Sequence, residues 1–134
     1  MSDIHTNLML PSNPCHVSQI EPFVDKLAQE MHIGPEMHGN ILISLTEAVS
    51  NAMLHGNGGD QSKTVSISLR RQKDAVAIRV SDQGSGFNPS KVPDPTSQEC
   101  IEECGGRGIF LMRNLADECK FSKNGSTVEM RFKF

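Results

Sequence analysis

Three polar side chains that could do chemistry recur every four residues in one stretch of the sequence: Glu47, Asn51 and His55. A step of four residues rotates a side chain by only about 40° around an α-helix, so a helix here would align all three along one face. An acid, an amide and an imidazole would then point the same way. A solvated face of an amphipathic helix shows the same spacing, so this polar stripe alone does not establish a site.

Two glycine-rich segments downstream add groups that suit a nucleotide. Asp82, Gly84 and Gly86 follow a predicted strand, where an unhindered backbone admits a planar ligand and the carboxylate can accept from an exocyclic amine. The run Gly105 to Gly108 precedes a predicted helix, whose free N–H groups and positive dipole end favour a phosphate. Because ATP needs a base pocket, a cation ligand and a phosphate cradle, these segments and the polar stripe together favour a nucleotide site.

Helical spacing of apolar residues predicts the elements that carry these groups. Ser18 and Glu21 stand at capping-box spacing at the start of a first helix, whose apolar stripe runs over residues 20–31. A second helix over residues 35–54 carries the polar stripe and is closed by the glycines at 56, 58 and 59. A short third helix over residues 109–115 follows the second glycine-rich segment.

Alternation of apolar and polar residues predicts the strands. One strand lies at residues 4–10, and residues 64–81 form a hairpin that turns near Lys73. Residues 119–122 lead through an Asn124-Gly125 turn into a last strand, whose inward side chains are Val128, Met130, Phe132 and Phe134. The predicted fold is an α+β two-layer sandwich, a mostly antiparallel sheet of about five strands with helices on one face.

Length and composition set the broad class. The 134 residues, 37% of them hydrophobic, fit a single domain spanning residues 1–134. There is no apolar run long enough for a bilayer and no signal-peptide pattern at the start, so we expect a cytoplasmic protein without a membrane partner. A formal net charge of −3, with Lys and Arg scattered and no Trp or Tyr, argues against nucleic acid as a partner.

The four cysteines give weak signals. Cys100 and Cys104 form a single C-x₃-C without a second Cys/His pair, which is poor support for a metal site. A cytoplasmic setting argues against structural disulfides.

The motifs resemble, in kind and order, the three boxes of the gyrase and histidine-kinase type ATPases. They are Glu47-x₃-Asn51-Ala-x₂-His55-Gly56, Asp82-x-Gly84-x-Gly86-Phe87 and Gly105-Gly106-Arg107-Gly108-Ile-Phe-Leu-Met. Their spacing and the small size are most similar to the bacterial anti-sigma-factor serine/threonine kinases. The resemblance covers nearly the whole chain and implies the Bergerat fold, which holds ATP between the helix layer and a mobile lid. The lid would be the proline-punctuated segment 88–104.

The resemblance also implies roles for single residues. Asn51 would be the Mg²⁺ ligand and Asp82 the adenine reader. Gly84 and Gly86 would let the backbone pass close to the base. Ser126 resembles the hydroxyl position that supports the adenine pocket, placed inward by strand alternation, with Thr127 as its rival.

The third box implies a phosphate cradle. Gly105, Gly106 and Gly108 would wrap the triphosphate of ATP at the start of the third helix, and Arg107 would add a guanidinium contact to phosphate. Glu47 resembles the general base that takes the proton of an incoming serine hydroxyl, although in the ATPase members the same Glu activates water instead.

Two functions follow from the resemblance. The first is a serine/threonine kinase that acts as an anti-sigma factor in transcription regulation. It would bind and silence a sigma factor and phosphorylate a small anti-anti-sigma (STAS-type) protein, and a homodimer is compatible with this role. The second is a non-catalytic switch that binds ATP only to shape a protein-binding surface in a bacterial signalling pathway. Glu47 favours the kinase.

Overall fold

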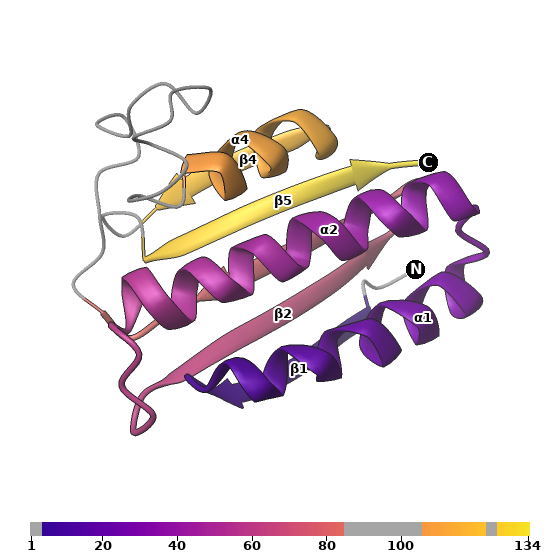
Figure 1. Cartoon of the computed structure of the whole chain (residues 1–134). Coiled ribbons are helices and arrows are strands. Elements are labelled where there is room, and N and C mark those ends of the chain that lie inside the picture. The colour runs from indigo at the N-terminus through magenta and orange to yellow at the C-terminus, as the bar shows by residue number, and fades with distance from the viewer. Residues whose placement is uncertain (1–3, 85–105, 123–125) are drawn as a thin grey trace.

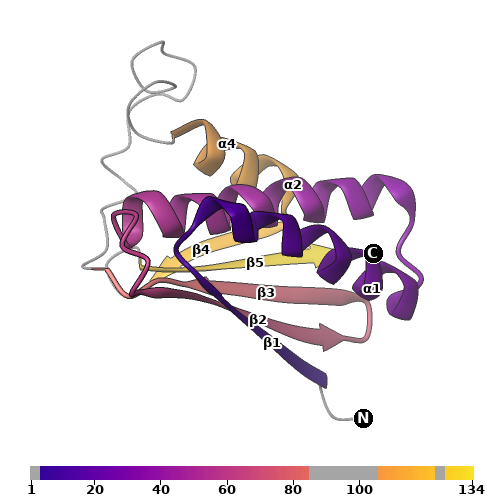
Figure 2. The ribbon, with the colours of Figure 1, turned by 60° about the horizontal axis from the view of Figure 1, so that its bottom comes forward.

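The computed structural model describes residues 4–84, 106–122 and 126–134. Five strands form one antiparallel sheet in the order β1-β2-β3-β5-β4, and the helices cover one of its faces (Figures 1 and 2). This confirms the predicted two-layer sandwich. The strands are β1 (Ile4–Pro11), β2 (Thr64–Gln72), β3 (Ala75–Ser81), β4 (Glu118–Ser122) and β5 (Thr127–Lys133), and the α-helices are α1 (Ile20–Met31), α2 (Pro35–Asn51) and α4 (Gly106–Leu115).

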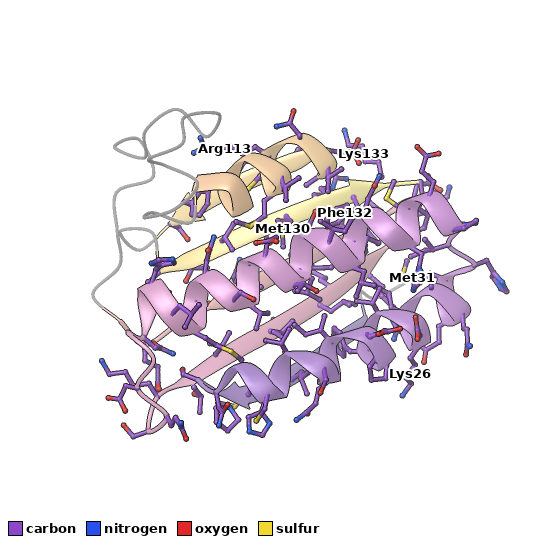
Figure 3. All side chains as sticks on the ribbon, in the orientation of Figure 1. Lys26, Met31, Arg113, Met130, Phe132 and Lys133 are labelled. Atoms are coloured by element: carbon purple, nitrogen blue, oxygen red, sulfur yellow. The ribbon has the colours of Figure 1, made fainter. Side chains whose placement is uncertain are left out.

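The core lies between the sheet and the helices (Figure 3). Alternate residues of β2, β3 and β5 point into it, as the period of two predicts, and Met130 and Phe132 of β5 are fully buried. The prediction that Phe134 also faces inward is wrong. It follows the end of β5, its N–H donates to the Asp74 carbonyl at 2.9 Å, and 43% of its surface is exposed. The alternation therefore stops where the strand stops.

The start of α1 differs from the predicted capping box. Ser18 lies in a short 3₁₀ helix, η1 (Pro14–Gln19), where its hydroxyl donates to the Cys15 carbonyl at 3.1 Å. Gln19 precedes α1 and makes no side-chain cap bond, while the Ile20 N–H donates to the carbonyl of Val17. Because η1 runs directly into α1, the Val17 carbonyl in the preceding 3₁₀ turn pairs the first N–H group of α1, and the predicted side-chain cap does not form.

The helix α2 continues into a π-helical turn, η2 (Ala52–Gly56), instead of ending at Leu54. The Asn57 N–H donates to the Ala52 carbonyl at 2.8 Å, which is the five-residue spacing of a π turn. This wider turn changes the angular position of His55 relative to Asn51, and the His55 side chain is exposed. The polar stripe therefore does not extend unbroken to His55.

None of the helices in residues 4–84 and 106–122 is long and apolar enough to cross a membrane.

Candidate nucleotide-binding site

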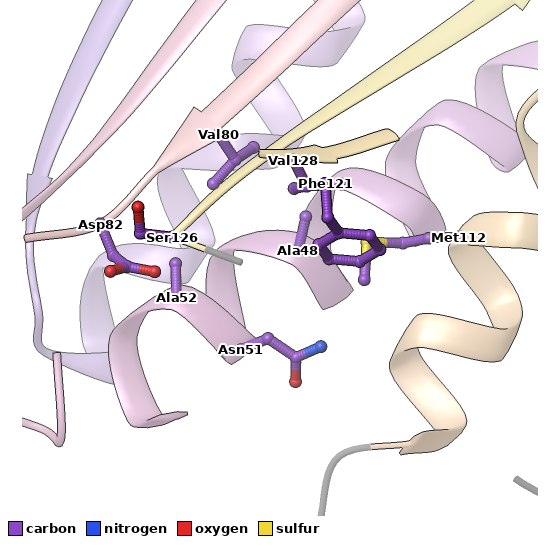
Figure 4. Close-up of a pocket in the computed structure, with 9 residues that line it drawn as sticks. All are labelled: Ala48, Asn51, Ala52, Val80, Asp82, Met112, Phe121, Ser126 and Val128. Atoms are coloured by element: carbon purple, nitrogen blue, oxygen red, sulfur yellow. The ribbon is translucent and has the colours of Figure 1, made fainter. Parts of the chain in front are cut away.

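A pocket lies between α2 and the edge of the sheet formed by the ends of β3, β4 and β5. It encloses ≈ 290 Å³ of space not filled by atoms, including the part that opens to solvent. Figure 4 shows Asp82 and Ser126 together at one side of it, Phe121 and Met112 at the other, and Asn51 on the helix between them. The residues that line it are Ala48, Asn51, Ala52, Val80, Asp82, Met112, Phe121, Ser126 and Val128.

Asn51 is the last residue of α2. The buried neighbours Ala48 and Ala52 hold this part of the helix against the core, and their small side chains leave the space beside the sheet open. The Asn51 side chain is partly exposed at the pocket. An amide oxygen at this position is available to a cation or to a bound ligand.

Asp82 follows the end of β3, and its backbone N–H donates to the Ser126 carbonyl at 2.9 Å. Its Oδ1 atom accepts from the Gly84 N–H at 2.8 Å. Burial raises the pKa of the Asp82 carboxyl, while the Gly84 N–H and the positive charge of Lys63 act in the opposite direction. One carboxylate oxygen is thus committed to the loop, and Oδ2 remains an acceptor for a hydrogen-bond donor in the pocket.

Two glycines pack against this carboxylate from the helix and the loop. A Cβ added to Gly56 would overlap the Asp82 carboxyl group, and a Cβ added to Gly84 would overlap the backbone carbonyl of Gly56. The end of η2 and the loop after β3 are therefore in backbone contact. Sequence reasoning placed Gly84 beside a ligand, which stays a prediction because Gly84 does not line the pocket; the structure shows that it permits this close approach between two protein segments.

The choice between Ser126 and Thr127 is settled by β5, which begins at Thr127. Thr127 is buried on the other side of the strand, where its hydroxyl lies 3.1 Å from that of Ser81. Ser126 lines the pocket from the turn just before the strand. Ser126 and Val128 thus share the pocket side and Thr127 lies on the opposite side, as strand alternation predicts, while the role of Ser126 toward adenine stays a prediction.

The apolar wall of the pocket was missed by sequence reasoning. Val80 of β3 pairs with Val128 of β5, and Val128 pairs with Phe121 of β4, so the three form one row across the sheet. Met112 of α4 completes this wall. The guanidinium of Arg113 lies 5.6 Å from the centre of the Phe121 ring, on the α4 side. A flat apolar ligand such as a base suits this wall.

Several predicted site residues lie apart from the pocket lining. Glu47 is one helical turn before Asn51 on α2, is partly exposed, and forms no hydrogen bond or ion pair within the described part of the chain. Gly106, Arg107 and Gly108 are the first residues of α4, so this helix begins three residues before the predicted start at 109. Gly86, Gly105 and the segment 88–104 lie outside the described residues.

The residues present fit an adenine nucleotide with Mg²⁺. Oδ2 of Asp82 can accept from an exocyclic amine beside the apolar wall, and Asn51 offers an oxygen at the helix side. Within the described residues no group of three or more His, Cys, Asp or Glu side chains could hold a metal ion. A single side-chain oxygen from Asn51 suits Mg²⁺, which usually takes one or two protein ligands and completes its shell with waters and phosphates.

Fold and pocket together define a two-layer α+β domain of the nucleotide-binding class. A family model described as the histidine kinase-like ATPase domain matches residues 10–132. The chain therefore belongs to the histidine kinase-like ATPase domain family.

Three curated relatives that match the chain share one name. Proteins named serine-protein kinase RsbW match the chain in Bacillus licheniformis (30% identity, 90% of this chain and 79% of the relative), Bacillus velezensis (27%, 94% and 83%) and Oceanobacillus iheyensis (24%, 97% and 86%). These matches confirm the predicted resemblance to the serine kinases of this superfamily.

The raised pKa of Asp82 predicts an unusual stability effect. A carboxyl whose pKa is higher in the folded protein contributes stability below the unfolded pKa, near 3.8, and loses it as pH rises through the folded pKa. At pH 7 the ionised Asp82 therefore costs stability. Asp82→Asn stays neutral and keeps an oxygen for the Gly84 N–H, so it should raise the free energy of unfolding at pH 7, with the difference shrinking as the pH falls toward 3.8.

Urea unfolding of both proteins across this pH range checks the expectation. Asp60→Asn serves as a control of opposite sign, because hydrogen bonds from Ser62 lower the pKa of Asp60. Removing the Asp60 carboxylate should therefore reduce the free energy of unfolding at pH 7. An Asp82→Asn variant that is less stable than wild type at every pH would show that the carboxylate stabilises the fold.

Proposed function

We propose that this protein is an ATP- and Mg²⁺-dependent serine/threonine kinase that acts as an anti-sigma factor in the bacterial cytoplasm. It phosphorylates a serine of an anti-anti-sigma (STAS-type) protein and sequesters a sigma factor. One observation carries the proposal: Asn51 and Asp82 line the same pocket, and the helix of Asn51 holds Glu47, a carboxylate without a partner in the described chain, one turn earlier. The serine kinase relatives support the same reaction class.

In this account each side chain has a separate task. Asp82 accepts from the 6-amino group of adenine, and the row formed by Val80, Val128 and Phe121 contacts the face of the base. Mg²⁺, when bound, neutralises phosphate charge, and Asn51 supplies its protein oxygen. The free N–H groups at the start of α4 suit the phosphates, since a helix N-terminus favours an anion.

Glu47 performs the proton transfer. As the serine oxygen of the partner bonds to the γ-phosphorus, the serine proton passes to the Glu47 carboxylate and the bond from the γ-phosphorus to the β,γ-bridging oxygen breaks. The products are phosphoserine and ADP. The partial exposure of Glu47 fits this role, because the acceptor hydroxyl arrives from another protein.

A phosphotransfer assay tests the function. The full chain is incubated with ATP labelled at the γ-phosphate, Mg²⁺ and a candidate STAS-type protein, and we expect label on one serine of that protein. The partner with this serine changed to Ala is the control and should stay unlabelled. A wild-type protein that binds ATP and a sigma factor yet labels no candidate partner would refute the kinase and leave the non-catalytic switch.

A further inference from the structure

The side chain of Asn57 is a buried polar group that neither the family motifs nor the pocket includes. It directly follows η2 and is 3% exposed. Its Nδ2 group donates to the Ser12 hydroxyl at 2.7 Å and to the Thr64 carbonyl at 3.1 Å. Its Oδ1 atom accepts from the Gln83 N–H at 2.7 Å. Both N–H bonds of the amide and one acceptor site are thus used inside the protein.

These bonds surround the contact between helix and loop on which Asp82 depends. Asn57 follows Gly56, and Gln83 follows Asp82, so the amide joins the residues next to both sides of the packed Gly56–Asp82 pair. The Gln83 side chain adds a second tie, since its Oε1 accepts from the Thr64 N–H at 2.7 Å. The loop after β3 is therefore fixed to the end of η2 and to the start of β2.

We propose that Asn57 is a positioning residue that holds the Asp82 carboxylate in the base pocket. Without Oδ1 of Asn57, the Gln83 N–H loses its acceptor, and the loop that carries Asp82 loses its direct bond to the helix end. This inference rests on the proposed function, because it gives Asp82 the task of reading the adenine amino group. It predicts an effect on base recognition beyond any effect on folding.

The two ends of the Asn57 amide allow an effect on base recognition to be separated from an effect on folding. Nδ2 bonds to Ser12, which follows β1, and to Thr64, which begins β2, and neither residue lines the pocket, whereas Oδ1 bonds to the loop of Asp82. Ser12→Ala removes a partner of Nδ2 and keeps the Oδ1 bond, so it is a matched control for loss of stability. Asn57→Ala removes both ends, and Asn57→Asp keeps an acceptor for the Gln83 N–H while losing the donors.

The readout is the ratio of the dissociation constants of purine riboside triphosphate, which lacks the 6-amino group, and ATP, both with Mg²⁺. In the wild type this ratio should be roughly 10-fold or more, as expected for a hydrogen bond to a charged group. Asn57→Ala should reduce it to about the ratio of Asp82→Ala. Ser12→Ala and Asn57→Asp should keep it within about 3-fold of wild type, even where thermal unfolding shows that they are less stable.

Each outcome decides the inference. An Asn57→Ala variant that is destabilised but keeps the wild-type ratio would overturn it and leave Asn57 a structural residue. If Asn57→Ala does not fold, Asn57→Asp still tests the proposal, because loss of discrimination with the acceptor retained would contradict it. A wild-type ratio near one would instead remove the adenine role of Asp82, and with it both the proposed function of the pocket and this inference.

Discussion

Glu47→Gln should reduce phosphoryl transfer to a partner serine by roughly 10²-fold or more, with little change in ATP affinity. Glutamine keeps the shape and hydrogen-bonding reach of the side chain but cannot take the serine proton. Because Glu47 has no partner within the described residues and is partly exposed, the substitution breaks no described contact and should preserve the fold. Single-turnover transfer and calorimetric ATP titration measure the two quantities separately.

Glu36→Gln is the matched control for this experiment. Glu36 lies on the same helix in its exposed first turn, eleven residues before Glu47, which is about 16 Å along the axis. Its transfer rate should equal that of wild type. Unchanged transfer in Glu47→Gln would remove Glu47 as the base. Loss of ATP binding together with transfer would show that Glu47 holds the cation or the fold.

Gly84→Ala should weaken ATP binding by roughly 10- to 100-fold, the range expected when a hydrogen bond to a charged group is lost. The added methyl group would overlap the carbonyl of Gly56, which is backbone and cannot rotate away. Either the loop with Asp82, which lines the pocket, or the end of η2, which packs on the Asp82 carboxylate, must then move. The ATP dissociation constant, measured on protein shown to be folded, checks this.

The control for Gly84→Ala is Gly39→Ala. Gly39 lies inside α2, where an added Cβ would meet nothing within 4 Å. Alanine at an unhindered helix position is favourable by roughly 0.5–1 kcal/mol, so Gly39→Ala should be slightly more stable and bind ATP normally. If Gly84→Ala also binds ATP like wild type, the close packing of Gly84 on Gly56 is not needed for the site.

The sheet and the polar members of the site were accessible to sequence reasoning because each leaves a local signal. Alternation in residues 64–81 and in the last strand reflects one buried face, and the structure forms both predicted hairpin pairings, β2 with β3 and β4 with β5. Asn51 and Asp82 were found from motif spacing, and the pocket brings them together. The single-domain organisation and the lid at residues 88–104 stay predictions.

The parts that sequence reasoning missed depend on three-dimensional contacts. Val80, Val128 and Met112 alternate or recur like any core residue, so nothing local separates the pocket wall from the core. The π turn after Asn51 has ordinary helical composition, and its last residue, Gly56, packs on Asp82, 26 residues later in the sequence. In the sequence Asn57 resembles an ordinary turn residue after a helix. Its buried hydrogen bond to Ser12 joins residues 45 positions apart, so no local pattern predicts it.

Calorimetric titration of wild-type protein with ATP and with GTP, each with and without Mg²⁺, tests the central claim most directly. We expect ATP to bind one site per chain, more tightly with Mg²⁺, because Asn51 is placed to hold the cation. GTP should bind at least 10-fold more weakly, since its 6-oxo group would face the Asp82 carboxylate, an acceptor against an acceptor. Absence of ATP binding in the presence of Mg²⁺, or equal affinity for both nucleotides, would contradict the assignment of this pocket to adenine.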